Sequence, residues 1–211
     1  MNADFPERLA ARLRQHPLPG RAAQRRFEPS LCYGRHFGPP TIRARAAAVL
    51  LLLYPHEGQW HLPLTVRPAT LVAHAGQISL PGGSVEPGET SPQAALRELN
   101  EELGVGAEEI ELLGGLSPLY VFVTEFLVTP WVAVARRRPA FAPSSLEVAE
   151  LLEVPLAHLL DPASQGRHAR RQRGVELSAP HFLWGRHRIW GATGMILGEL
   201  VALAEELEYG I

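Results

Sequence analysis

Three glutamates stand close together near the middle of the chain, at positions 98, 101 and 102. At about 100° per residue, this i, i+3, i+4 spacing puts Glu98, Glu101 and Glu102 within roughly 100° of arc on one side of a helix. Three leucines, at positions 96, 99 and 103, fall on the opposite side. Such a helix would pack by its leucine face and present three carboxylates on the other.

This placement of acids is unfavourable unless something positive is bound to them. Glu98 and Glu102 are like charges at i, i+4, and the last two glutamates stand at the negative end of the helix macrodipole. Clustered hard oxygen ligands suit Mg²⁺ or Mn²⁺. The alternative is a solvated acidic face, in which Arg97, four residues before Glu101, softens the repulsion without a metal.

The residues around the three acids set the limits of the helix. Thr90 or Ser91 can cap its first turn, and Pro92 suits a helix start, where no backbone donor is needed. Gly104 can take the left-handed conformation that ends a helix. Local sequence therefore predicts a short helix that begins after Thr90 or Ser91 and ends at Gly104.

The segment that leads into this helix favours a binding site over a solvated face. Residues 77–85, QISLPGGSV, have the pattern of a strand that ends in a glycine pair. Gly82 and Gly83 carry no side chain, so their backbone can come close to a ligand. We therefore expect the carboxylates and the glycine pair to belong to one site.

The whole segment from Gly83 to Val105 fits the pattern G-x5-E-x7-R-E-(aliphatic)-x-E-E-x-G-(aliphatic). It resembles the signature of the Nudix hydrolases, which split a nucleoside diphosphate linked to another moiety by attack of water on the pyrophosphate. The resemblance implies the Nudix fold, an α/β (α+β) sandwich with a mixed sheet between helices and a loop-helix-loop catalytic motif. It assigns divalent cations to the Gly83 carbonyl, Glu98, Glu101 and Glu102, and a bracing ion pair to Glu89 and Arg97.

The same resemblance implies the chemistry of the site. Mg²⁺ or Mn²⁺ ions bridging the pyrophosphate would neutralise its charge and lower the pKa of a bound water. A carboxylate would then accept the proton from that water. Glu101 is the first choice of base, and Glu147, on a later segment, is the second.

Upstream of the helix, residues 64–83 resemble a narrower signature, that of Nudix enzymes acting on coenzyme A. The matching positions are Leu64, Thr65, Arg67, His74, Gly76, Gln77, Pro81, Gly82 and Gly83. The departures are Pro68 for the usual Ser, Val72 for Arg and Leu80 for Phe. The resemblance implies that Arg67, His74, Gln77, Gly82 and Gly83 contact the substrate.

Residues 146–162 and 187–200 also resemble that subfamily, so the resemblance covers roughly residues 45–205. It implies hydrolysis of coenzyme A or a derivative to 3′,5′-ADP and 4′-phosphopantetheine. The alternatives are a Nudix hydrolase of ADP-ribose, dinucleotide or nucleoside triphosphate substrates, and a Nudix-fold binding module without turnover. An intact signature argues against the binding module.

Two further groups of residues allow a ligand role or a structural one. The arginines at 136–138 and within 167–173 could hold a 3′-phosphate, although a solvated rim is the stronger interpretation. His187, Arg188 and Trp190 are better read as an aromatic anchor where a helix begins than as ligand contacts.

Composition limits the class of ligand and the cellular compartment that the chain suits. The 211 residues carry a net charge of −2, which suits a small anionic substrate and gives no basic face for nucleic acid. The single cysteine, Cys32, excludes an intrachain disulfide and a cysteine-based zinc site, and suits a reducing compartment.

No signal peptide or membrane span is apparent, so we expect a cytoplasmic protein. All 20 basic residues are arginine, which suggests a bacterial, GC-rich genome, and the sequence leaves a homodimer open.

The elements expected along the chain make one domain over 43–211, with residues 1–42 as a helix and connector packed on it. A buried strand is expected at 46–54, a turn at 56–59 and a return strand at 60–67. Further expected elements are strands at 110–116, at 119–135 with a bend at Thr129-Pro130, and at 146–154, a helix at 156–160, a hairpin at 173–190 and an amphipathic helix at 192–209.

Overall fold

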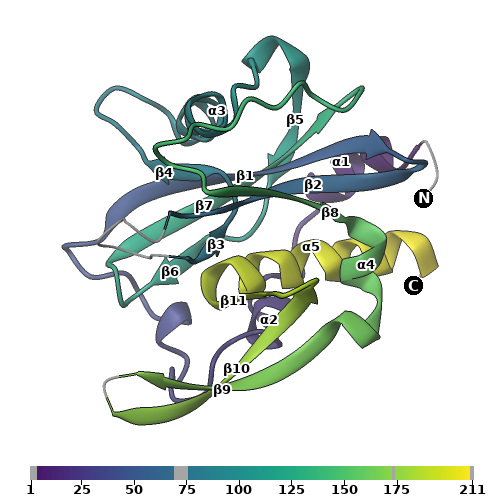
Figure 1. Cartoon of the computed structure of the whole chain (residues 1–211). Coiled ribbons are helices and arrows are strands. Elements are labelled where there is room, and N and C mark those ends of the chain that lie inside the picture. The colour runs from purple at the N-terminus through teal and green to yellow at the C-terminus, as the bar shows by residue number, and fades with distance from the viewer. Residues whose placement is uncertain (1–3, 69–75, 173, 210–211) are drawn as a thin grey trace.

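The computed structural model of the chain describes residues 4–68, 76–172 and 174–209 (Figure 1). Its centre is a mixed sheet built around β1 (Arg45–His56). That strand pairs in parallel with β7 (Phe126–Ala135) and antiparallel with β2 (Gln59–Val66) and β4 (Gly82–Ser84). The rest of the sheet comprises β3 (Ile78–Ser79) and β8 (Glu150–Pro155) beside β2, and β5 (Ile110–Gly115) and β6 (Leu119–Val121) beside β7.

The buried character of β1 follows from its sequence, because both faces of the strand are covered. Ala48, Leu50, Leu52 and Tyr54 pack against α3 (Ser91–Leu103) on one face. The alternate residues Leu51 and Leu53 join the core on the other face. Side chains alternate along a strand, so a continuous apolar run fills two cores at once.

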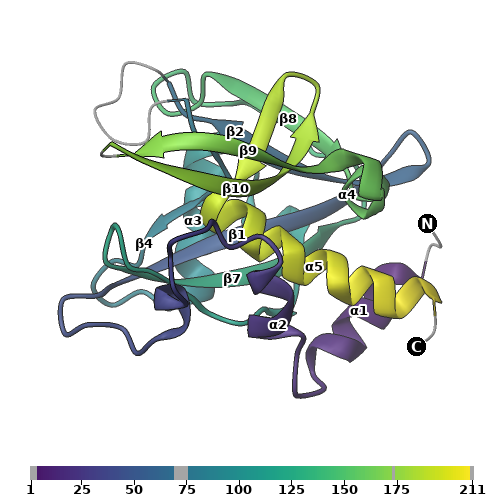
Figure 2. The ribbon, with the colours of Figure 1, turned by 90° about the horizontal axis from the view of Figure 1, so that it is seen from below.

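The second core contains α5 (Gly191–Tyr209), which lies between the main sheet and a smaller one (Figures 1 and 2). Every residue from Gly194 to Val201 is buried. An amphipathic helix with one exposed face was expected here, and that prediction is wrong for this stretch, because protein covers α5 on several sides. A helix that is apolar nearly all round is typical of such an interior position.

The smaller sheet contains one strand that the sequence pattern did not predict. It is formed by β9 (Gln165–Gln172), β10 (Val175–Trp184) and β11 (His187–Trp190), all antiparallel. The expected hairpin at 173–190 is present as β10 and β11. Strand β9 reads QGRHARRQ, which has no apolar alternation, and it forms because β10 offers a long edge for backbone pairing.

The single strand expected at 119–135 is also wrong, because the chain turns back on itself there. Strand β6 ends at Val121, and β7 begins at Phe126 and pairs with it. Glu125 has a φ of 57° in the turn, and its carboxylate accepts hydrogen bonds from the Tyr120 and Thr41 hydroxyls at 2.6 Å. No break occurs at Pro130, which lies within β7.

The N-terminal residues pack on this domain. Helix α1 (Phe5–Leu13) contacts β5 and α5, and α2 (Gly20–Arg25) contacts α5. The short helix α4 (Leu156–Leu160) follows β8 where the sequence predicts it. In the described part of the chain, no helix is long and apolar enough to cross a membrane.

A buried glutamate ties the N-terminal segment to α5. Glu199 is fully buried and accepts hydrogen bonds from the Gly20 backbone at 3.0 Å and the Gln24 amide at 2.9 Å. It also accepts from the Ser117 hydroxyl at 2.7 Å and from the Ser117 backbone. Donors from two distant segments thus converge on one carboxylate.

We predict that Glu199→Ala lowers the free energy of unfolding by about 2–4 kcal/mol, because several buried donors lose their acceptor together. Urea denaturation measures the change. Glu206→Ala is the matched control on the same helix, since Glu206 forms a partly exposed pair with Arg12 at 2.8 Å. That pair should contribute less than about 1 kcal/mol. Equal losses in the two variants would contradict the role assigned to Glu199.

Candidate active site

Helix α3 begins and ends where the local sequence predicts. Thr90 is the N-cap, and it forms a capping box with Gln93, whose side chain accepts from the Thr90 backbone at 2.8 Å. Ser91 is not the cap; its hydroxyl instead accepts a hydrogen bond from the Trp131 indole nitrogen at 2.8 Å. Gly104 ends the helix with a φ of 70°. The carboxylate side of α3 is thus fixed in position by both ends of the helix.

The glycine pair lies between β1 and α3, where neither position has room for a side chain. A Cβ at Gly82 would come within 2.3 Å of the Ala48 carbonyl oxygen. A Cβ at Gly83 would come within 2.2 Å of Glu98 Oε1. The backbone of β4 therefore lies directly against the carboxylate side of α3.

Glu102 is the most buried of the three acids on α3, at 4% exposure. One of its oxygens accepts from the Thr65 hydroxyl at 3.2 Å, and the other is 3.5 Å from the Gly82 nitrogen. Burial, with a smaller contribution from the charge of Glu98, raises the pKa of Glu102 to about 7, against the opposing effects of the Gly82 and Thr65 hydrogen bonds and of Arg67. A cation at this position would offset that cost of burial.

Glu98 lies at the centre of the acidic cluster. Burial raises its pKa, the hydrogen bond from Arg97 opposes this, and the charges of Glu101 and Glu147 raise it further. Glu147 thus lies within electrostatic reach of Glu98, although it is 49 positions away in the sequence. The intervening loop is held to α3 by backbone bonds, including one from the Ser144 nitrogen to the Glu102 carbonyl at 2.9 Å.

Arg97 binds several acceptors at the edge of the cluster. Its Nε donates to Glu89 at 2.9 Å, and its other nitrogens donate to Glu98, Glu101 and the Ser84 carbonyl. Glu101 is the most exposed of the three helix acids, with half of its side chain accessible. Arg97 therefore links the loop after β4 to the helix.

A cleft of about 850 Å³ opens beside the glycine pair. Arg67, Gln77, Gly82 and Gly83 all line it. Arg67 Nε is buried and has no hydrogen-bond partner among the described residues. A buried donor without an acceptor is costly, so this atom is suited to an anionic ligand. His74, the other expected contact in this segment, lies outside the described residues, as does Val72.

The two arginine groups differ in their relation to the cleft. Arg138 forms a two-pronged pair with Glu153 at 2.6 and 2.7 Å, away from the lining residues. Arg170 on β9 lies over the ring of Trp190, which does line the cleft. His187 contacts Glu150 at 3.3 Å.

Sequence reasoning missed part of the cleft wall. The connector after α2 supplies Cys32 and His36, and the turn after β6 supplies Phe122. The connector has no helical or strand periodicity, so its position was not predictable from hydrophobic pattern. Its regularly spaced Glu28, Cys32 and His36 were the available signal.

The chain belongs to the Nudix family: the model of the NUDIX domain matches residues 44–171. The fold agrees, since a Nudix hydrolase of M. smegmatis, RenU, aligns with a TM-score of 0.51 and 22% identity over 80% of this chain and 86% of that one. The protein is therefore a Nudix pyrophosphohydrolase, as its signature predicts. Enzymes of this family generally use divalent metal ions.

Among its relatives is the mitochondrial coenzyme A diphosphatase NUDT8 of Homo sapiens, 38% identical over 74% of this chain and 68% of that protein. An uncharacterized Nudix hydrolase, NudL of Photorhabdus laumondii, is 36% identical over 74% of this chain and 83% of that protein. Nudix hydrolase 3 of Caenorhabditis elegans is 30% identical over 75% and 72%.

We predict that Glu102→Gln stabilises the metal-free protein at pH 8 by about 1–3 kcal/mol and has little effect near pH 4. The folded-state pKa of Glu102, about 7, lies above the ordinary value of 4.5. The folded state therefore binds more protons than the unfolded state between these values, and wild-type stability falls as pH rises through that window. Denaturation in EDTA at several pH values measures it.

The matched control for this prediction is Glu108→Gln, because Glu108 is exposed. Its stability should follow the wild-type pH profile. A Glu102→Gln profile parallel to wild type from pH 4 to 8 would contradict the burial effect assigned to this carboxyl.

Proposed function

We propose that this protein hydrolyses the pyrophosphate of coenzyme A or a derivative, with Mg²⁺ or Mn²⁺, to 3′,5′-ADP and 4′-phosphopantetheine. The observation that carries the proposal is the position of Glu98 and Glu102 against the Gly82-Gly83 backbone, because that backbone lines the same cleft as the unpaired Arg67 Nε. Relatives named as coenzyme A diphosphatases, from human and mouse, support the choice of substrate.

The donor set fits divalent cations of the magnesium type. Glu98 and Glu102 are partly or fully buried carboxylates whose pKa values are raised, and carboxylate oxygens are the ligands that Mg²⁺ and Mn²⁺ prefer. Glu101 and the Gly83 carbonyl complete the proposed set. When bound, the ions would neutralise charge on the pyrophosphate and acidify a water.

Two carboxylates remain candidates for accepting the proton. Glu101 is on the helix, but its side chain is held by Arg97 at 2.9 Å. Glu147 is exposed, and among the described residues its carboxylate has no hydrogen-bond partner. We keep Glu101 as the first candidate, because it belongs to the signature, and Glu147 as the second. Glu89 and Arg97 are assigned to positioning the loop and helix.

Substrate orientation depends on the cleft. Arg67 is suited to a phosphate oxygen, because a charge-assisted hydrogen bond would satisfy its buried Nε. Gln77 and the glycine pair lie along the same wall. We assign these residues, together with His74, to substrate binding. Of the two arginine groups singled out in the sequence, the one that includes Arg170 is assigned to a further phosphate, such as the one at the 3′ position, because Arg170 contacts the cleft residue Trp190.

We predict that the purified protein with Mg²⁺ or Mn²⁺ converts coenzyme A to 3′,5′-ADP and 4′-phosphopantetheine, and that EDTA abolishes turnover. Glu98→Gln and Glu102→Gln should each lower kcat at least ~10²-fold, because each removes a charged cation ligand. Liquid chromatography with mass spectrometry measures the products.

The control for these variants is Glu108→Gln, which should retain wild-type kcat. ADP-ribose, a dinucleotide and a nucleoside triphosphate belong in the same panel. Turnover of ADP-ribose without turnover of coenzyme A would reject the substrate and retain the reaction class. Full activity in Glu98→Gln at saturating Mg²⁺ would reject the proposed ligands.

We predict that Arg67→Ala raises KM for coenzyme A by about 10-fold or more with a smaller change in kcat, because its charged hydrogen bond to substrate is worth about 1.5–3 kcal/mol. Steady-state kinetics measure the split. Arg136→Ala, at an exposed arginine outside the cleft lining, is the matched control and should behave as wild type. Unchanged kinetics in Arg67→Ala would remove Arg67 from the site.

A further inference from the structure

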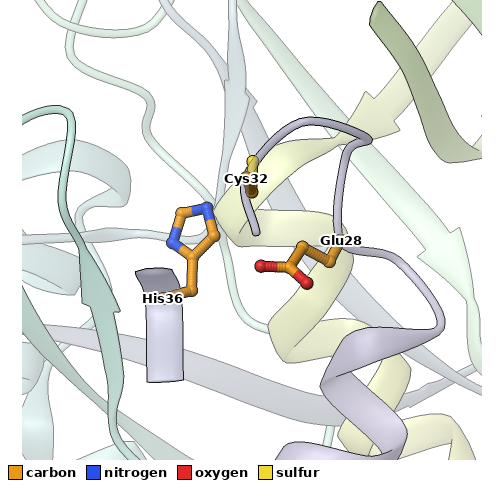
Figure 3. Close-up of side chains that lie close together, drawn as sticks. All are labelled: Glu28, Cys32 and His36. Atoms are coloured by element: carbon orange, nitrogen blue, oxygen red, sulfur yellow. The ribbon is translucent and has the colours of Figure 1, made fainter. Parts of the chain in front are cut away.

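A second group of possible ligands lies in the connector after α2. Glu28, Cys32 and His36 each offer one ligand atom, and these atoms lie within 4.8 Å of one another. Figure 3 shows the three side chains close together, with the Glu28 carboxylate directed toward the His36 ring. They recur every four residues in the sequence, although the segment that carries them is not a continuous helix.

His36 is arranged as a metal-binding histidine would be. It is 8% exposed, and its Nδ1 is 2.8 Å from the Tyr120 carbonyl oxygen, to which it can only donate. Such a bond fixes the tautomer and leaves the Nε2 lone pair for a metal. Burial lowers the pKa of His36, so the neutral ring predominates near pH 7.

Glu28 supplies an independent observation. Its Oε1 is buried and has no hydrogen-bond partner among the residues that the structure describes. A buried carboxylate oxygen without a donor is costly, and a cation is one of the few partners that would satisfy it. Glu28 also raises the pKa of the Cys32 thiol, after the larger effect of burial, while Arg35 lowers it. A bound cation would offset the repulsion between the Glu28 carboxylate and the Cys32 thiolate.

We propose that Glu28, Cys32 and His36 bind a thiophilic divalent cation, Zn²⁺ in the first place, at the wall of the substrate cleft. The expectation that a single cysteine excludes a cysteine-based zinc site is thereby revised, because the fold brings a glutamate and a histidine to that cysteine. One sulfur, one nitrogen and one oxygen ligand match the three protein ligands that zinc takes when water or another small ligand completes its coordination. Tetrahedral zinc ligands lie about 3.3–3.8 Å apart, given bonds of ~2.0–2.3 Å. Side-chain shifts of about 1 Å would therefore bring the three atoms into place.

This site differs in chemistry from the carboxylates of α3. Those offer only oxygen ligands, which favour Mg²⁺ or Mn²⁺, whereas Cys32 selects for softer metals. Cys32 and His36 both line the cleft that contains Arg67 and Gly83. The proposal therefore adds a second kind of metal ion beside the substrate, and it does not depend on which pyrophosphate is hydrolysed.

Cobalt spectroscopy tests the site directly, because Cys32 is the only cysteine of the chain. Reduced wild-type protein titrated with Co²⁺ should develop a thiolate-to-cobalt charge-transfer band in the near ultraviolet, which Zn²⁺ should then displace. Cys32→Ser should lack the band. Glu28→Gln and His36→Gln should each weaken Zn²⁺ binding, measured by competition, at least about 10-fold.

Two controls keep the result specific. His16→Gln changes an exposed histidine and should leave the affinity for Zn²⁺ unchanged. Glu98→Gln should keep the charge-transfer band, because cobalt on the α3 carboxylates has no sulfur ligand. Absence of the band in wild type, or an unaltered affinity in both Glu28→Gln and His36→Gln, would overturn the site without affecting the proposed hydrolase.

Discussion

The site depends on a close approach between the β4 backbone and α3, which is possible because position 83 has no side chain. A Cβ there would overlap the Glu98 carboxylate, so a side chain at this position would displace that carboxylate from the glycine loop. A Cβ at Gly82 would likewise overlap a neighbour, the backbone of β1 at Ala48. The carboxylates consequently face backbone rather than solvent, and their distance from the glycine loop is set by packing.

The close packing of β4 against α3 concentrates negative charge at buried carboxylates, where water cannot fully screen it. Glu102 is buried against Thr65 and Gly82, and burial raises its pKa to about 7. Arg97 compensates only the outer part of the cluster, where it binds Glu89, Glu98 and Glu101. The inner part lacks an equivalent partner in the described structure. An arrangement of this kind is poor for stability on its own and well suited to binding cations.

The N-terminal segment both covers the core and forms part of the cleft wall. Glu199 collects donors from Gly20, Gln24 and Ser117, and thereby holds α2 against α5. The connector that follows α2 is then directed along the cleft, where Cys32 and His36 meet the lining residues of the sheet. The same packing that buries α5 thus decides which side chains of the connector face the cleft.

The sequence by itself determined the elements whose causes are local. The capping box at Thr90, the stop at Gly104 and the spacing of Glu98, Glu101 and Glu102 fixed α3 and its acidic side, because these effects act within one or two helical turns. The apolar run within β1 likewise identified a strand buried on both faces. The nine fixed positions between Gly83 and Val105 identified the family.

Only the tertiary structure decided the rest, because the responsible contacts join residues far apart in the chain. Strand β9 has no apolar alternation and exists through pairing with β10. The stretch of α5 from Gly194 to Val201 is buried because the helix lies between two sheets. Glu147 approaches Glu98 through a loop held by backbone bonds, which leave no pattern in the sequence. The grouping of Glu28, Cys32 and His36 has a regular spacing but no helix to explain it, so its meaning depended on how the connector folds over the cleft.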